Sequence, residues 1–265
     1  MSTVPDTAVG PLEAHLRGRR DTGRKLLLPY LTAGYGPEWP RLVEAVAAAG
    51  ADAIEIGIPF SDPVMDGPTI QISSAAALAA GTTPGGVLDA VEELDAGVPL
   101  VAMTYYNIPF HMGLKRYAAR LRRAGIAGAI LPDLPLDESG PWTDEADAAG
   151  VETIFLAPPT CSDERLGRIV ERCRGFVYGV GVVGITGERE ELAVTATKIA
   201  GRLKALTDKP VVIGVGVSTP EQAAQVAEVA DGVVVGSAII RQLIDHGPEA
   251  AVDLVGALRA GLDHG

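Results

Sequence analysis

The chain has 265 residues, of which 47% are hydrophobic, and its formal net charge is −12. A chain of this length can bury a sizeable core as one barrel-sized domain. The acidic balance argues against nucleic acid as a partner, because phosphate backbones are bound by lysine and arginine. No apolar run is long enough to cross a bilayer, and residues 1–10 lack the pattern of a signal peptide, so we expect a soluble, cytoplasmic protein.

Short apolar segments alternate with longer helical patterns along most of the chain. Residues 1–10 are expected to form a loose tail and residues 11–20 a short charged helix. Strands are expected at 25–32, 53–57, 100–105, 128–131, 152–156, 176–180, 211–215 and 233–235. Helices are expected at 38–49, 68–80, 86–95, 113–124, 137–149, 163–173, 189–206, 220–229 and 238–262, the last broken at 247–248.

This alternation predicts the fold. Eight strands, each followed by helix, indicate a (β/α)8 TIM barrel, a single α/β domain over residues 1–265. Continuous apolar strands of this length suit a parallel sheet that is covered by helices. A doubly wound open sheet is the alternative, but it usually has fewer strands, and no Gly-x-Gly-x-x-Gly follows the first strand.

Two acids stand out at the second expected strand. Alternation places the isoleucines of segment 53–58 on one face and Glu55 on the other, which is the lumen if the barrel closes. A carboxylate there is costly unless something uses or satisfies it. Asp66 follows in the loop beyond the strand end, where barrels keep their chemistry. The pair is therefore a candidate catalytic pair; the alternatives are a structural carboxylate bonded to a nearby Tyr or Thr, and a turn residue before Gly67.

Glycines follow the last two expected strands. The stretches 213–222 and 235–237 each lead from a strand through glycine into a helix, and Thr219 and Gln222 have capping-box spacing. Glycine lets backbone approach a ligand, and a helix N-terminus offers free N–H groups, so we expect phosphate here rather than ordinary turns. The segment 184–191 between them is either a lid or a plain surface connection.

The four histidines give no sign of a metal site. They are His15, His111, His246 and His264, and none has a metal-ligand spacing with another His, Cys or Asp. No metal is therefore expected.

The segment 55–71, Glu-Ile-Gly-Ile-Pro-Phe-Ser-Asp-Pro-Val-Met-Asp-Gly-Pro-Thr-Ile-Gln, resembles the signature of the tryptophan synthase α-subunit family. Segments 103–107, 131–135 and 184–187 and the two glycine stretches support the resemblance, which covers essentially the whole chain. It implies retro-aldol cleavage of indole-3-glycerol phosphate to indole and glyceraldehyde 3-phosphate in tryptophan biosynthesis, by a lyase without a cofactor.

The resemblance also assigns roles to residues. Glu55 would be the acid/base group, with a pKa raised by burial, and Asp66 would be the partner of the indole N–H. The indole ring would lie among Tyr30, Ile70, Met103, Tyr105, Ile130, Tyr178 and Thr186. Phosphate would contact Gly187, Gly216, Gly236 and Ser237.

A partner subunit is implied as well. A PLP-dependent β subunit, in an α2β2 heterotetramer, would bind the face that carries Pro59, Phe60, Asp62 and Asn107, because residues 59–63 are expected to form an exposed loop. The alternatives are a stand-alone lyase that releases free indole and a catalytically idle barrel that activates a β partner. A phosphate-sugar isomerase is disfavoured, because Tyr30 and Phe155 stand in strands one and five, where its carboxylates would be.

Overall fold

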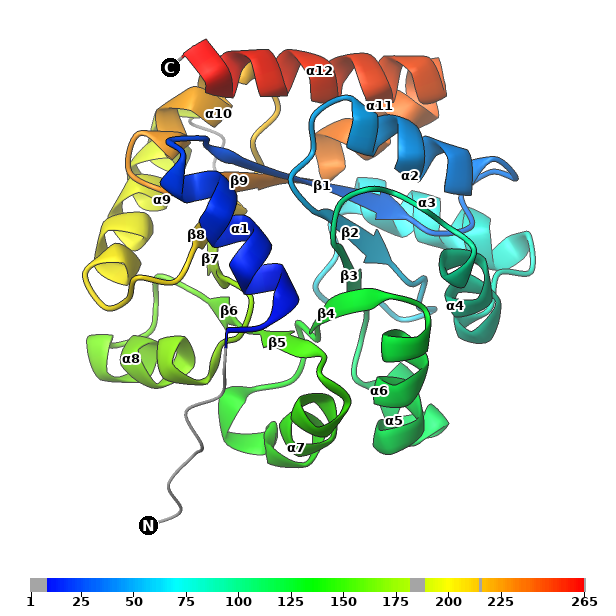
Figure 1. Cartoon of the computed structure of the whole chain (residues 1–265). Helices are drawn as coiled ribbons and strands as arrows, with labels where there is room; N and C mark the ends of the chain where they lie inside the picture. Colours follow the sequence, from blue (N-terminus) through cyan, green and yellow to red (C-terminus); the bar gives the residue numbers. More distant parts are fainter. Residues whose placement is uncertain (1–8, 182–188, 215, 265) are drawn as a thin grey trace.

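The computed structural model describes residues 9–181, 189–214 and 216–264 (Figure 1). Most of the expected tail, residues 1–8, lies outside this part. The strands are β1 (Leu26–Thr32), β2 (Ile54–Gly57), β3 (Leu100–Met103), β4 (Ile126–Ile130), β5 (Glu152–Ile154), β6 (Leu156–Ala157), β7 (Val177–Val180), β8 (Val211–Gly214) and β9 (Gly232–Val235). The helices are α1 (Pro11–Asp21), α2 (Trp39–Ala48), α3 (Pro68–Ala79), α4 (Pro84–Glu92), α5 (Asn107–Met112), α6 (Leu114–Arg123), α7 (Gly140–Ala149), α8 (Asp163–Arg172), α9 (Arg189–Lys204), α10 (Pro220–Ala227), α11 (Ser237–His246) and α12 (Pro248–His264), with a 3-10 turn, η1, at Leu136–Glu138.

The strands form a nearly closed parallel barrel, which confirms the predicted TIM barrel. Their order is β5-β4-β3-β2-β1-β9-β8-β7-β6, so the two ends of the sheet are consecutive in the chain. The expected fifth strand is split at Phe155, where β5 pairs with β4 and β6 pairs with β7. The N–H of Phe155 points instead at the thiol of Cys173, 3.3 Å away. The split therefore lets one segment serve both edges and close the ring.

Two local predictions differ from the structure. The third strand ends at Met103 rather than at 105, and a short helix, α5, follows at Asn107, where none was expected. The helix expected over 137–149 begins as the 3-10 turn η1 and continues as α7. The break expected in the final helix is confirmed, because Gly247 has a φ of 93° and separates α11 from α12.

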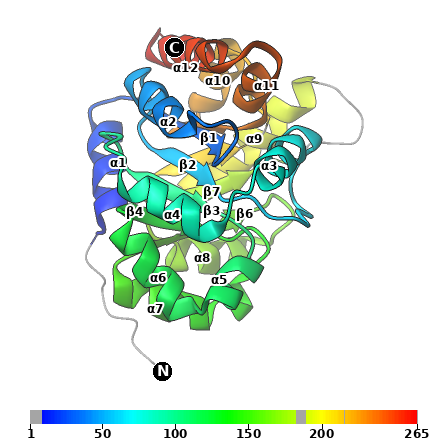
Figure 2. The same cartoon turned by 90° about the vertical axis from the view of Figure 1, so that its right-hand side faces the viewer.

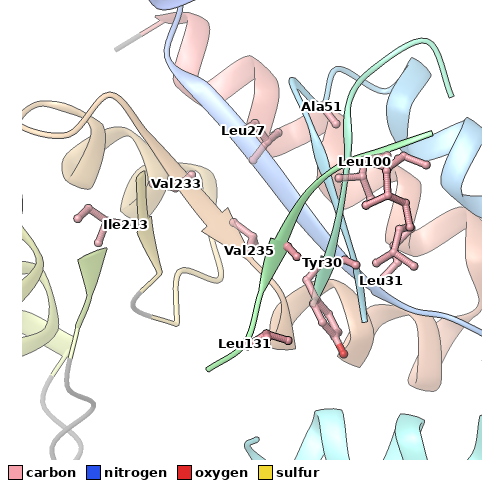
Figure 3. Packing of buried hydrophobic residues seen from close by; sticks show 14 of the residues in the cluster. Leu27, Tyr30, Leu31, Ala51, Leu100, Leu131, Ile213, Val233 and Val235 are labelled. Carbon is pink, nitrogen blue, oxygen red and sulfur yellow. The ribbon is translucent and has the colours of Figure 1, made fainter. Parts of the chain in front are cut away.

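The outer core lies between the barrel and its helices. The alternation at β2 holds, since Ile54, Ile56 and Ile58 are buried among residues of this layer. Figure 3 shows part of it around Leu27 and Val233.

A smaller inner core fills the lumen and is closed at one end by α1. Leu12 and Leu16 of α1 are fully buried against lumen residues such as Val101. The carboxylate of Glu152 fixes this helix by accepting hydrogen bonds from the N–H of Leu12 at 2.7 Å and of Glu13 at 3.0 Å. Since α1 covers the N-terminal end of the barrel (Figure 1), a ligand reaches the lumen from the carboxyl end.

None of the helices within the described ranges combines the length and apolar character that crossing a membrane requires.

Candidate active site

A cavity of about 260 Å³ opens where the strands end and brings together most of the predicted site residues. It is lined by Tyr30, Glu55, Met65, Asp66, Gly67, Ile70, Met103, Tyr178, Gly214, Gly216, Val234, Gly236 and Ser237. Both predicted acids, four of the seven predicted indole contacts and three of the four predicted phosphate contacts are in this set.

Glu55 lies deep in this cavity and has no hydrogen-bond partner among the described residues. Its place in β2, between Tyr30 on β1 and Val101 on β3, turns the side chain into the lumen. The residue is 1% exposed, and neither carboxylate oxygen is bonded to any group in the described ranges. Burial raises the pKa of Glu55 to about 8, because the charged form loses its hydration. The alternative interpretation was a structural carboxylate bonded to a nearby Tyr or Thr, but the described residues show no such bond to Glu55.

Two tyrosines form walls of the same space. Tyr30 and Tyr178 both line the cavity, and burial raises the pKa of each hydroxyl, so both stay neutral. Each ring lies over a glycine. A Cβ at Gly57 would lie 1.9 Å from the Tyr30 hydroxyl, and one at Gly214 would lie 2.5 Å from the Tyr178 hydroxyl. These two strand positions therefore exclude any larger residue.

Asp66 stands at the mouth of the cavity, in the loop between β2 and α3. Gln71, in the first turn of α3, donates from Nε2 to the Asp66 carbonyl at 2.7 Å. The Tyr105 hydroxyl accepts the N–H of Met65 at 2.9 Å and donates to the Asp66 carboxylate. Burial raises the pKa of Asp66, and the Tyr105 hydrogen bond opposes that rise. The Asp66 carboxylate is thus fixed at the cavity by hydrogen bonds. This differs from the alternative interpretation, in which Asp66 would only form the turn before Gly67.

Several predicted contacts fall elsewhere. Tyr105 is 4% exposed but is absent from the cavity lining, because its hydroxyl serves the Asp66 loop and its ring stacks on Phe60 with centroids 5.3 Å apart. Ile130 is fully buried in the inner core and is also absent from the lining. Thr186 and Gly187 lie outside the described residues, as does most of segment 184–191, which was expected to be either a lid or a plain surface connection.

The phosphate end has the expected backbone geometry. Gly216, with a φ of 74°, and the pair Gly236 and Ser237 line the cavity from the ends of β8 and β9. Ser237 is the first residue of α11, so this helix presents its free N–H groups at the cavity.

The capping box that was expected at α10 is only half formed. Thr219 Oγ1 accepts the N–H of Gln222 at 3.3 Å, but the Gln222 side chain accepts the N–H of Ser218, at 2.8 Å, instead of that of Thr219.

Four lining residues were missed from the sequence: Met65, Gly67, Gly214 and Val234. A signal existed for Gly214, since glycine inside an apolar strand marks a close approach. Val234 follows from strand alternation once β9 is placed. No sequence pattern indicated that Met65 lines the cavity, because its position depends on the path of an irregular loop.

The prediction that residues 59–63 form an exposed loop is wrong for the first two of these residues. Pro59 is buried, and Phe60 is half-buried by its stacking on Tyr105. Asp62 and Asn107 are exposed as expected. Large apolar side chains are nevertheless exposed on nearby segments, namely Val64 (80%), Met65 (59%) and Phe110 (63%).

No group of three His, Cys, Asp or Glu residues is arranged to hold a metal ion within the described ranges.

Comparisons with known proteins point to one family. A family model for the tryptophan synthase alpha chain matches residues 16–259. The tryptophan synthase alpha chain of Streptomyces coelicolor is 43% identical over 256 residues, which are 94% of each chain, and that of Mycobacterium avium is 40% identical over 264 residues, 98% of this chain and 97% of the relative. A solved tryptophan synthase from Mycobacterium tuberculosis has a TM-score of 0.88 at 38% identity and covers 96% of this chain and 99% of that chain. A tryptophan synthase subunit alpha from Legionella pneumophila has a TM-score of 0.88 at 33% identity and covers 97% and 100%.

The raised pKa of Glu55 predicts a specific dependence of stability on pH. Between the ordinary carboxyl pKa and about 8 the folded protein holds a proton that the unfolded chain has lost, so Glu55 makes folding less favourable as pH rises through this range. Glu55→Gln removes this effect. In urea titrations, we expect the free energy of unfolding of the Glu55→Gln mutant to be higher than that of the unchanged protein. This difference should be larger at pH 8 than at pH 5. An equal difference at both pH values would mean that the Glu55 carboxyl ionises normally.

Proposed function

The chain belongs to the tryptophan synthase alpha chain family, and from that premise we propose that Glu55 and Asp66 carry its reaction. The protein is a lyase of tryptophan biosynthesis that acts on indole-3-glycerol phosphate and yields indole and glyceraldehyde 3-phosphate. The observation that carries the residue assignment is an unpartnered, buried carboxyl in the lumen with a second carboxylate at the mouth of the same cavity. A cytoplasmic location stays our expectation from the sequence.

Glu55 suits the proton transfers of this cleavage. With a pKa of about 8 it is largely protonated at neutral pH and can give its proton to C3 of the indole ring. The resulting carboxylate then takes the proton of the hydroxyl on the carbon attached to C3. The bond between that carbon and C3 breaks, its electron pair enters the ring, and the hydroxyl oxygen becomes the aldehyde oxygen of the phosphorylated product.

Asp66 acts at the ring nitrogen. Protonation of C3 places positive charge on that nitrogen, and a nearby carboxylate stabilises the charge before the C–C bond breaks. The hydrogen bond from Tyr105 and the bond from Gln71 to the Asp66 backbone hold this group in one geometry. Fixed geometry matters because misplacing a catalytic group by about 1 Å can cost roughly a hundredfold in rate.

The two ends of the substrate match the two ends of the cavity. The indole ring lies between the tyrosine walls, Tyr30 and Tyr178, where Ile70 and Met103 also line the space. The phosphate lies at the N-terminus of α11 and the glycines after β8, where N–H groups can bind an anion without a dedicated cation. A dianion can thus be bound by a chain with a net charge of −12.

The β subunit binds the face that carries Phe60, Asp62 and Asn107, whereas Pro59 of the same loop is buried. Phe60 stacks on Tyr105, and the Tyr105 hydroxyl is hydrogen-bonded to the Asp66 loop. A protein that docks on Phe60 and displaces its ring would therefore also change the position of Asp66. This contact chain favours a complex over the stand-alone lyase. The presence of both acids in one cavity disfavours an idle barrel.

Removing either acid should abolish cleavage. We expect Glu55→Gln and Asp66→Asn each to lower the rate of indole release by about two to four orders of magnitude, since each removes one proton-transfer or electrostatic contribution. Circular dichroism should show that both variants remain folded. Near-normal turnover by either folded variant would exclude that residue as a catalytic group.

A side chain at the phosphate end should weaken substrate binding. A Cβ at Gly236 would lie 3.3 Å from Tyr30 Cβ, and the larger valine side chain would also narrow the backbone cradle. We expect Gly236→Val to raise the dissociation constant of glycerol phosphate at least tenfold, by roughly the worth of one or two charge-assisted hydrogen bonds. Gly256→Val is the matched control, because a Cβ at Gly256 in α12 meets nothing within 4 Å. Equal affinity in the two variants would place phosphate elsewhere.

Activation by the partner can be measured directly. We expect indole release to rise when a PLP-dependent β subunit is added, and Phe60→Ala to reduce that rise more than it reduces the rate of the chain alone. The assay compares both proteins with and without the β subunit, alongside a sizing column. A high rate that the β subunit leaves unchanged, with no complex on the column, would favour the stand-alone lyase.

A further inference from the structure

One hydrogen bond joins the helix of the phosphate end to the helix that follows the catalytic loop. Helices α11 and α3 lie side by side (Figure 2), and Arg241 Nη2 on α11 donates to Thr69 Oγ1 on α3 at 2.7 Å. Arg241 is one turn beyond Ser237, and Thr69 is the second residue of α3. The bond therefore connects the second turn of α11 to the first turn of α3, and both helices reach the cavity.

The first turn of α3 controls the position of Asp66. Gln71 bonds the Asp66 carbonyl at 2.7 Å and also closes the turn through its N–H to Gly67, at 3.0 Å. Ile70, between Thr69 and Gln71, lines the cavity wall. Because Thr69 is only 6% exposed, its hydroxyl moves with the body of the helix. A shift of this turn would move both the acid and part of the indole wall.

The first turn of α11 is anchored equally firmly. Ile239 and Ile240 are fully buried, and Gly236 and Ser237 line the cavity at the start of the helix. A phosphate bound there would fix this turn and, through the rigid helix, the root of the Arg241 side chain.

Arg241 differs from the other bridging arginines in what it binds. Arg120 pairs with Asp89, and Arg202 pairs with Asp163, so these guanidiniums are neutralised by a carboxylate. No described carboxylate forms an ion pair with Arg241, and its hydrogen bond goes to a hydroxyl. Arg241 is an exposed residue and Thr69 is buried, so this charged donor reaches from the surface to a hydroxyl on the neighbouring helix.

We propose that Arg241 is a positioning residue that couples occupation of the phosphate subsite to the placement of Asp66, through its hydrogen bond to Thr69. The proposal rests on the phosphate and indole ends assigned above. Binding energy from the phosphate, which takes no part in the chemistry, is in this way used to orient the acid at the distant ring. Filling of the phosphate subsite fixes α11 against α3, and the Asp66 loop is held more firmly through the first turn of α3.

The first test separates binding from turnover. Thr69→Val removes the hydroxyl with little change in shape and no change in charge, and Thr69→Ser keeps it. We expect Thr69→Val to lower kcat for indole release about tenfold, the worth of one hydrogen bond to a charged group, while the dissociation constant of glycerol phosphate stays within about twofold. Thr69→Ser should retain kcat. Unchanged kcat in a folded Thr69→Val protein would overturn the proposal.

A double-mutant cycle tests whether the two residues act together. Arg241→Met should lower kcat to a similar degree, and the double variant should be no worse than either single variant, because both remove the same bond. Arg41→Met is the control, since Arg41 is an exposed arginine on α2 that pairs with Glu38, the residue before that helix, and does not line the cavity. Losses that add in the double variant would mean that the residues act separately.

A second readout does not depend on catalysis. Glycerol phosphate should slow amide hydrogen exchange in residues 61–67 of the unchanged protein, and this protection should disappear in Thr69→Val although glycerol phosphate still binds. Protection that persists in Thr69→Val would overturn the coupling alone. Failure of glycerol phosphate to bind the unchanged protein would overturn the coupling together with the proposed phosphate subsite, whereas normal binding and coupling without indole release would contradict only the proposed catalytic roles.

Discussion

The buried carboxyl of Glu55, which has no hydrogen-bond partner among the described residues, is the constraint on which the site depends. A buried acid without a hydrogen-bond partner in the described chain is expensive to ionise, so the protein holds it as a neutral acid. That state needs a position with little exposure to solvent, and the packing of Leu12 and Leu16 closes the lumen at the opposite end from the cavity mouth. The neutral hydroxyls of Tyr30 and Tyr178 line the cavity without adding charge. In the proposed mechanism, stability is given up at this position for a proton that can be transferred.

The end of the cavity that we propose for phosphate differs from Glu55 in the kind of group it offers. Its groups are backbone amides at strand ends and at a helix N-terminus, whose positions are fixed by the fold itself. Glycine at 216 and 236 keeps those amides accessible. The acidic surface of the chain therefore need not carry a lysine-rich patch to bind an anion. The same site combines a costly buried acid at one end with inexpensive backbone dipoles at the other.

Sequence reasoning succeeded where a regular period controls direction. Alternation along β2 turned Glu55 into the lumen, and the order of strands predicted that the glycines after β8 and β9 would meet at one cavity. It failed where the chain leaves regular structure. Tyr105 lies past the end of β3, so strand alternation no longer decides its direction, and its hydroxyl turns to Met65 and Asp66. The burial of Phe60 depends on that same ring, which no local pattern in 59–63 reveals.

The split at Phe155 has a consequence for assembly of the fold. Strands β1 to β5 pair in chain order, and so do β6 to β9, so neighbours within each half are close in sequence. The pairing of Leu26 in β1 with Gly232 in β9 is different, since it joins the two extremes of the barrel. Loops between distant residues carry the greatest entropic cost and slow folding most. In this chain that cost falls on the pairing of β1 with β9 alone. The other two edge strands, β5 and β6, are already held together because only Phe155 separates Ile154 from Leu156 in the chain. The barrel thus consists of two sheets of sequential strands, β1–β5 and β6–β9. They are joined covalently at Phe155 on one side and by the long-range pairing of β1 with β9 on the other.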